Sequence, residues 1–137
     1  MRSIFVLIAL IMAAGMASAD WYPQTTLSTL SVGVNATTTI DTTLTSADTK
    51  TVYGMDGSGA SVTLTLPDAT TVTGRIYIIP TAADMGANNI VVATTGAGKL
   101  GGANGADTLT STDASASLSV VSDGTNYLII SKVGTWT

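Results

Sequence analysis

Hydrophobic and polar residues alternate with a period of two along much of the chain. Residues 61–66 (SVTLTL) alternate apolar side chains with threonine, and residues 115–121 (SASLSVV) alternate them with serine. This period predicts half-buried β-strands with one wet face. Residues 75–79 (RIYII) and 127–130 (YLII) are apolar without alternation, which predicts central strands covered on both faces.

Short strand patterns recur between turn signals, and no long segment shows a helical period or an internal repeat. Asp-Gly pairs at 56–57 and 123–124 predict hairpin turns, because these residues tolerate positive φ. The sequence therefore predicts an all-β fold, a small antiparallel β-sandwich of jelly-roll-like type with short strands and Gly/Asp turns. The expected strands are residues 37–44, 51–55, 61–66, 75–79, 90–94, 115–121 and 127–133.

The N-terminus has the pattern of a secretion signal. One basic residue, Arg2, precedes an apolar run at 4–16, and Ala17-Ser18-Ala19 follows as a cleavage site. The run is shorter than the roughly 20 apolar residues of a membrane-spanning helix. Residues 1–19 are thus expected to be a cleaved signal peptide. We expect a secreted protein, extracellular or at the cell surface, with no membrane association after cleavage.

Residues 20–36 form an expected N-terminal arm ahead of a β-sandwich domain at 37–137. Within the arm, Leu30, Val32 and Val34 alternate with Ser31 and Gly33, which is a strand period. An extended arm of this kind can add a strand to a neighbour's sheet, where main-chain hydrogen bonds supply affinity. We therefore expect Leu30, Val32 and Val34 to act in assembly.

The composition removes most catalytic chemistry. The chain has nine acidic residues, all Asp, and no His or Cys, which excludes Ser-His-Asp systems and the usual zinc sites. Asp residues in turns usually hydrogen-bond the backbone, so we expect no enzyme, no metal and no cofactor. After cleavage, four basic residues face nine Asp. This balance argues against nucleic-acid binding, because no basic patch can neutralise phosphates.

A glycine-rich segment at 96–101 matches the pattern G-x-G-x-x-G. A dinucleotide site would need a helix to begin there, but further Gly and Asn residues follow and disfavour one. We interpret residues 96–105 as a loop, and as the candidate binding surface of an adhesin or glycan-binding module. Its candidate residues are Gly96, Gly98, Lys99, Gly101 and Asn104.

Six segments carry a family resemblance: 42–45 (TTLT), 51–56 (TVYGMD), 62–68 (VTLTLPD), 74–79 (GRIYII), 89–92 (NIVV) and 118–130 (LSVVSDGTNYLII). Through them, residues of about 40–131 resemble small β-sandwich modules of phage tail fibres, head fibres and capsid decorations. The resemblance implies a compact β-sandwich, commonly trimeric, with no catalytic residues. Virion proteins assemble in the host cytoplasm, so the location is inferred from residues 1–19 instead.

Two functions fit these observations. The first is a secreted, non-enzymatic structural subunit that assembles with copies of itself through β-sheet contacts, as a trimer or a filament. It would form a filament, a coat or the tip of a fibre. The second is an adhesin or glycan-binding module with a cell-surface or glycan partner, using the loop at 96–105.

Overall fold

The computed structural model describes residues 33–82 and 85–137, so Leu30, Val32 and the expected signal peptide lie outside the described residues. One short 3-10 helix, η1 (Ala69–Thr71), follows β4, and no helix in the described ranges is long and apolar enough to cross a membrane. The strands are β1 (Val34–Thr38), β2 (Thr42–Thr43), β3 (Val52–Met55), β4 (Val62–Leu66), β5 (Ile76–Pro80), β6 (Ile90–Thr94), β7 (Thr108–Ser111), β8 (Ser117–Ser122) and β9 (Tyr127–Val133).

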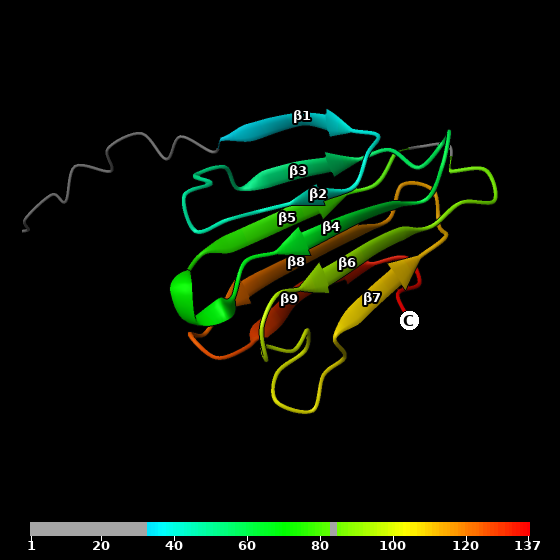
Figure 1. Ribbon diagram of the computed structural model, residues 1–137. Helices are drawn as coiled ribbons and strands as arrows, with labels where there is room; N and C mark the ends of the chain where they lie inside the picture. Colours follow the sequence, from blue (N-terminus) through cyan, green and yellow to red (C-terminus); the bar gives the residue numbers. More distant parts are fainter. Residues whose placement is uncertain (1–32, 83–84) are drawn as a thin grey trace, which may run out of the picture. The chain divides into compact units, whose positions relative to one another are not determined.

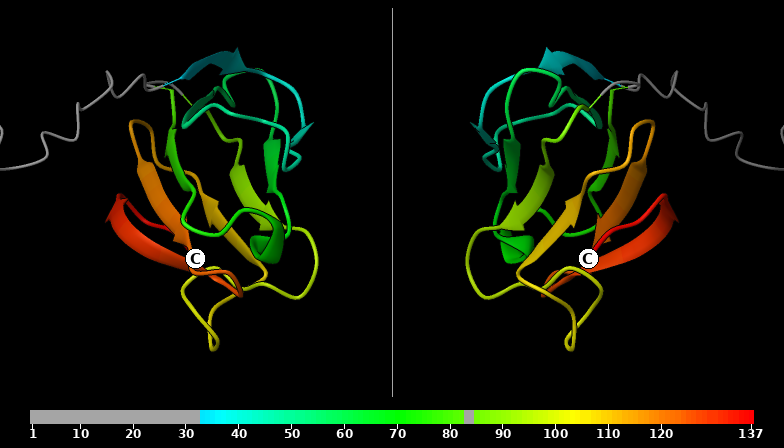
Figure 2. Two further views of the ribbon diagram at one scale, coloured as in Figure 1. Left: turned by 90° about the vertical axis from the view of Figure 1, so that its left-hand side faces the viewer. Right: turned by 90° about the vertical axis from the view of Figure 1, so that its right-hand side faces the viewer.

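The strands form two sheets that pack face to face (Figures 1 and 2). The five-stranded sheet has the order β1-β3-β5-β8-β9, and the four-stranded sheet has the order β2-β4-β6-β7. Each sheet turns one face inward, which is why its strands alternate buried and partly exposed residues. The predicted all-β sandwich is confirmed.

The strand pairing differs from the antiparallel, jelly-roll-like arrangement that the sequence predicts. From β1 to β6 the chain crosses to the other sheet after every strand, so β1·β3, β3·β5, β2·β4 and β4·β6 are parallel pairs. Only β5·β8, β6·β7 and β8·β9 are antiparallel. The first six strands therefore wind as three successive coils, each contributing one strand to each sheet.

The two Asp-Gly pairs, both predicted to close hairpins, have different roles in the strand pairing. Asp123-Gly124 closes the predicted hairpin between β8 and β9, and Gly124 has a φ of +92°. Asp56-Gly57 instead begins a crossover from β3 to β4. Gly57 is buried there, and a Cβ atom on it would lie 2.9 Å from Met85 Cε. The same dipeptide therefore closes a hairpin at 123–124 and allows two segments to pack closely at 56–57.

Strand boundaries differ in three places. The predicted strand 37–44 is divided into β1 and β2, which belong to different sheets. Strand β7 (Thr108–Ser111) was not predicted. Strand β1 begins at Val34, which pairs with Val52 of β3, so the last part of the expected arm belongs to the sandwich.

Three tyrosines line the inner face of the five-stranded sheet. The ring centroids of Tyr53 and Tyr77 are 6.1 Å apart, and those of Tyr77 and Tyr127 are 5.9 Å apart. The Tyr127 hydroxyl donates to the carbonyl oxygen of Pro67 at 2.9 Å, which ties β9 to the end of β4 in the other sheet. In contrast, the buried hydroxyls of Tyr53 and Tyr77 have no hydrogen-bond partner within the described residues. Of the three phenols, one therefore bridges the two layers and two are unsatisfied.

Removing the hydroxyl of Tyr127 and removing that of Tyr53 should affect the stability of the fold differently. Tyr127→Phe should lower the free energy of unfolding by about 1 kcal/mol, because it removes a net-favourable hydrogen bond and leaves the Pro67 oxygen unpaired. Tyr53→Phe should leave stability unchanged or raise it, because no bond is lost. Urea denaturation of both variants checks this. A loss in Tyr53→Phe as large as that in Tyr127→Phe would contradict the assignment.

Candidate functional site: the outer face and edges of the five-stranded sheet

Exposed apolar side chains gather on one sheet. Seven large hydrophobic residues are exposed in the described ranges, and all but Ile40 lie on strands of the five-stranded sheet. Single exposed apolar residues are ordinary, but a cluster marks an interaction surface. The six residues on the sheet are Val34, Ile76, Leu128, Ile129, Ile130 and Val133.

The register of the strands brings several of these residues together. Ile76 of β5 pairs with Val121 of β8, and Val121 pairs with Leu128 of β9. Their sequence neighbours Tyr77 and Val120 are fully buried. Because side chains alternate between the faces of a strand, the first three residues form a row on the outer face.

A second row continues the first toward the opposite edge. Val34 of β1 pairs with Val52 of β3, and Val52 pairs with Ile78 of β5. Ile78 lies two positions after Ile76 on the same strand and therefore on the same face. We call the two rows together the outer apolar patch: Val34, Val52, Ile76, Ile78, Val121 and Leu128.

The four-stranded sheet presents a different outer face. Thr63 and Thr65 of β4 and Thr110 of β7 alternate with buried leucine or valine neighbours, and so point outward. Val91 pairs with both Thr63 and Thr110 on this face. Threonine therefore dominates here, and the two outer faces differ in polarity.

Strand β9 lies at the edge of its sheet, contrary to the prediction that residues 127–130 form a central strand covered on both faces. Tyr127 is buried, but Leu128, Ile129 and Ile130 are exposed by 43%, 36% and 56%. The prediction assumed that an apolar run without alternation needs cover on both sides. Here both sides of an edge strand are apolar and open to solvent. The register shifts opposite Ser119 and Val120, which makes Ile130 the extra residue of a β-bulge.

The other three edges are shorter, more polar or covered. Strand β7 is covered by the C-terminal residue, since Thr110 N donates to Thr137 O at 2.8 Å and Thr137 N donates to Thr110 O at 3.0 Å. Strand β2 has two residues. On β1, the Asn35 side chain accepts a hydrogen bond from Lys50 Nζ at 2.9 Å, which places a charge beside that edge. Such features normally discourage strand addition. Strand β9 also carries Lys132 and the bulge, but it is the longest of the four edges, with seven residues. We therefore take β9 as the candidate edge for an added strand.

The predicted binding loop at 96–105 extends from one end of the sandwich (Figure 1). Several of its backbone groups have partners: Lys99 N donates to Asn126 Oδ1 at 3.0 Å, and Gly101 N donates to Tyr127 O at 2.7 Å. Lys99 Nζ forms an ion pair with Asp107. The loop thus covers the first residue of β9 and leaves the strand open beyond it.

Two further loop residues have packing roles. Gly96 has a φ of +75°, and a side chain there would collide with the Asp68 carboxylate. The Gly98 carbonyl accepts a hydrogen bond from Thr94 Oγ1 at 2.6 Å. Asn104, by contrast, is exposed near the end of the loop. Of the five predicted loop residues, Asn104 is therefore the one whose role in the fold is smallest.

Every aspartate in the described ranges accepts a hydrogen bond or forms an ion pair. The turn backbones of Ser58, Thr70 and Asn126 donate to Asp56, Asp68 and Asp123 respectively, and these hydrogen bonds lower the pKa of each carboxyl. No group of three or more potential acidic metal ligands occurs in the described part of the chain. The predicted structural role of these turn aspartates is confirmed for the described residues.

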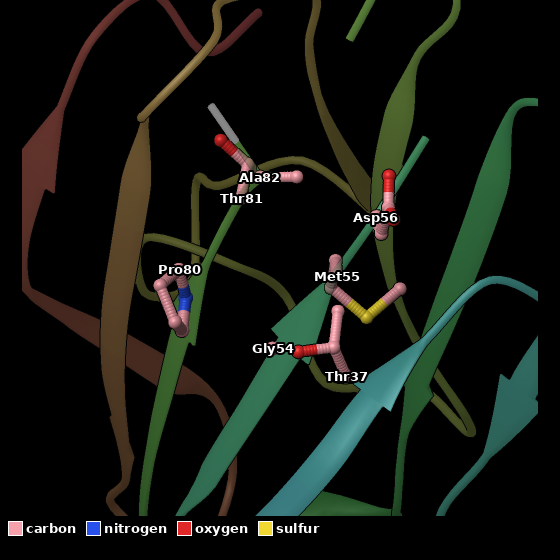
Figure 3. Close-up of a pocket in the computed structure, with 7 residues that line it drawn as sticks. All are labelled: Thr37, Gly54, Met55, Asp56, Pro80, Thr81 and Ala82. Atoms are coloured by element: carbon pink, nitrogen blue, oxygen red, sulfur yellow. The ribbon is translucent and has the colours of Figure 1, made fainter. Parts of the chain in front are cut away.

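One pocket, of about 370 Å³, lies at the carboxyl ends of β1, β3 and β5 (Figure 3). The Asp56 carboxylate in this pocket accepts from Ser58 N at 2.9 Å, and the Thr81 hydroxyl lies 3.2 Å from the carbonyl oxygens of Asp113 and Ala116. The pocket therefore offers few free polar groups for a ligand. Its lining residues are Thr37, Gly54, Met55, Asp56, Pro80, Thr81 and Ala82.

The chain matches no protein-family model, no curated protein and no solved structure. The candidate site is therefore argued from its own geometry.

Sequence reasoning found part of this site. Of the predicted assembly residues, Val34 lies in the outer apolar patch, whereas Leu30 and Val32 lie outside the described residues. The patch residues Ile76 and Leu128 were taken for core because their segments lack alternation. The edge position of β9 follows from the order β1-β3-β5-β8-β9, for which residues 127–133 carry no local signal.

The aspartate turns give the protein a specific response to acid. A carboxyl whose pKa is lowered by folding contributes stability above its unfolded pKa of about 4, and that contribution is lost as the pH falls through the folded value. The double variant Asp68→Asn, Asp123→Asn keeps the accepting oxygens but no longer titrates. Its unfolding free energy, measured in urea from pH 5 down to about 2, should vary less with pH than that of the wild type. An equal pH dependence would show that these turns do not couple protonation to folding.

Proposed function

We propose that the protein is a non-enzymatic structural subunit that acts outside the cell and assembles with copies of itself through the five-stranded sheet. The outer apolar patch carries this proposal. It places six apolar side chains on one outer face, although Ser119 and Ser131 lie on the same face, whereas the outer face of the other sheet is rich in threonine. Burial of such a patch against a partner is favourable at roughly 25 cal/mol per Å² of apolar surface.

Three further features support the same function. The turn aspartates and the occupied polar groups of the pocket leave no evident catalytic pair among the described residues. The resemblance of residues of about 40–131 to phage fibre and decoration modules points to assembly. The signal-like segment at 1–19 points to a location outside the cytoplasm.

The alternative of an adhesin or glycan-binding module is supported less by the geometry. The backbone amides of Lys99 and Gly101 are bonded within the fold, and the Lys99 charge is paired with Asp107. A glycan array probed with the assembled protein would favour this alternative if it gave a signal that was lost in Asn104→Ala.

The test of self-assembly is the mass of residues 20–137 in solution, measured by light scattering over a range of concentrations. The wild type should form a multimer. The double variant Ile76→Thr, Leu128→Thr should need at least about tenfold more protein to assemble, because it removes exposed apolar area from the outer apolar patch. Threonine suits a strand, so the fold should persist.

The matched control is Val91→Thr, which makes the same kind of change on the outer face of the four-stranded sheet. It should assemble as the wild type does. A wild-type protein that stays monomeric, or a control that weakens assembly as much as the double variant, would overturn the proposed surface.

A further inference from the structure

We propose that the open edge of β9 accepts residues 26–32 of a second copy of the chain as an added strand. This inference rests on the proposed self-assembly and names its partner segment and its acceptor. The added strand would form main-chain hydrogen bonds along the edge of the sheet, whereas the outer apolar patch would pack against the surface of a partner.

The acceptor is defined by what surrounds β9. The loop at 96–105 bonds to Tyr127 at the beginning of the strand, and Trp136 Nε1 donates to Val133 O at 3.0 Å at its end. Between these two contacts, residues 128–132 lie at the sheet edge with no further strand beside them in the described chain. An edge that is capped at both ends and open between them limits where an incoming strand can lie.

The side chains of the edge and of the arm have matching character. Leu128 points to the outer face and Ile129, opposite the buried Val120, to the inner face, so an incoming strand meets apolar groups on both sides. As an added strand, residues 26–32 would place Leu30 and Val32 on one face and Leu27 on the other. Residues 26–32 contain no charge, Gly or Pro. This composition suits a strand that adds to a sheet.

Length and direction also favour a second copy. Seven extended residues span about 23 Å, which is enough to cover the open residues 128–132 of β9. The arm leads into β1, where the Gly33 carbonyl accepts from Thr51 N at 2.8 Å and from Val52 N at 3.1 Å. Strand β1 is the edge of the five-stranded sheet opposite to β9 (Figure 1). The point where the arm joins the described chain, at Gly33 before β1, and the acceptor edge β9 are therefore at opposite edges of the five-stranded sheet.

This arrangement predicts head-to-tail contacts. A donor on one side and an acceptor on the other generate a ring if the rotation closes, and a filament if it does not. Direct pairing of two β9 edges is disfavoured by the bulge at Ile130, which twists the strand. A separate arm can follow that twist, whereas two folded edges must match as rigid bodies.

Disulfide trapping tests the contact, because the chain has no Cys of its own. One full-length preparation of residues 20–137 carries Ser31→Cys in the arm, and a second carries Ser131→Cys on β9. After the two are mixed and mildly oxidised, non-reducing electrophoresis should show a covalent heterodimer. The controls replace Ser131→Cys by Ala36→Cys on β1 or Thr43→Cys on β2, both exposed edge positions, and should give several-fold less.

Each other result overturns the inference in a recognisable way. Stronger trapping at Ala36→Cys or Thr43→Cys moves the acceptor to another edge. Dimers of Ser131→Cys alone show that β9 of a second copy occupies the edge. A chain with both cysteines that closes only on itself shows that the arm binds its own domain. If the protein assembles but none of these cysteine pairs forms a disulfide, the arm is not part of the interface.

A noncovalent variant separates this inference from the proposed function. Leu30→Pro removes an arm N–H group and disfavours a paired strand, so assembly should need at least about tenfold more protein. If Leu30→Pro assembles like the wild type while Ile76→Thr, Leu128→Thr does not, self-assembly stands and the arm is not its donor. If the wild type is monomeric, both proposals fail together.

Discussion

Parallel hydrogen-bond ladders between successive coils of the chain are the constraint on which this fold depends. Val34, Val52 and Ile78 stand side by side although they are 18 and 26 positions apart in sequence. Because a parallel pair cannot be closed by a short hairpin, each coil must cross to the second sheet before it returns. The sandwich, its two outer faces and the positions of its edges all follow from this winding.

The coils also explain which parts of the structure could be predicted. The alternation in residues 61–66 predicted β4 to within one residue, because one face of that strand is buried and the other is wet. The three coils do not appear as an internal repeat in the sequence, because their crossovers differ in length and the coils share only the register of their strands. Strand pairing depends on segments that are distant in the sequence, so local patterns do not predict it.

The site illustrates the same limit. Local chemistry predicted the roles of Asp68 and Asp123, since a turn aspartate bonds to a backbone only a few residues away. The identity of β9 as an edge depends on the order of five strands, so YLII was taken for core. The glycine-rich segment 96–105 is a loop, as predicted, but its packing against Asp68 depends on a contact 28 positions away.

The separation between paired strands also shapes the order in which the chain folds. Ladders between distant segments form slowly, because loop entropy is lost before the contacts are gained. The β8–β9 hairpin joins neighbouring residues through a four-residue turn and is expected to form before the coils close. The apolar side chains of β9 are then displayed early, when the chain is most prone to aggregate. Strand β9 contains Lys132 and the bulge at Ile130, and a charge and a bulge are the features that normally keep an exposed strand from pairing without control.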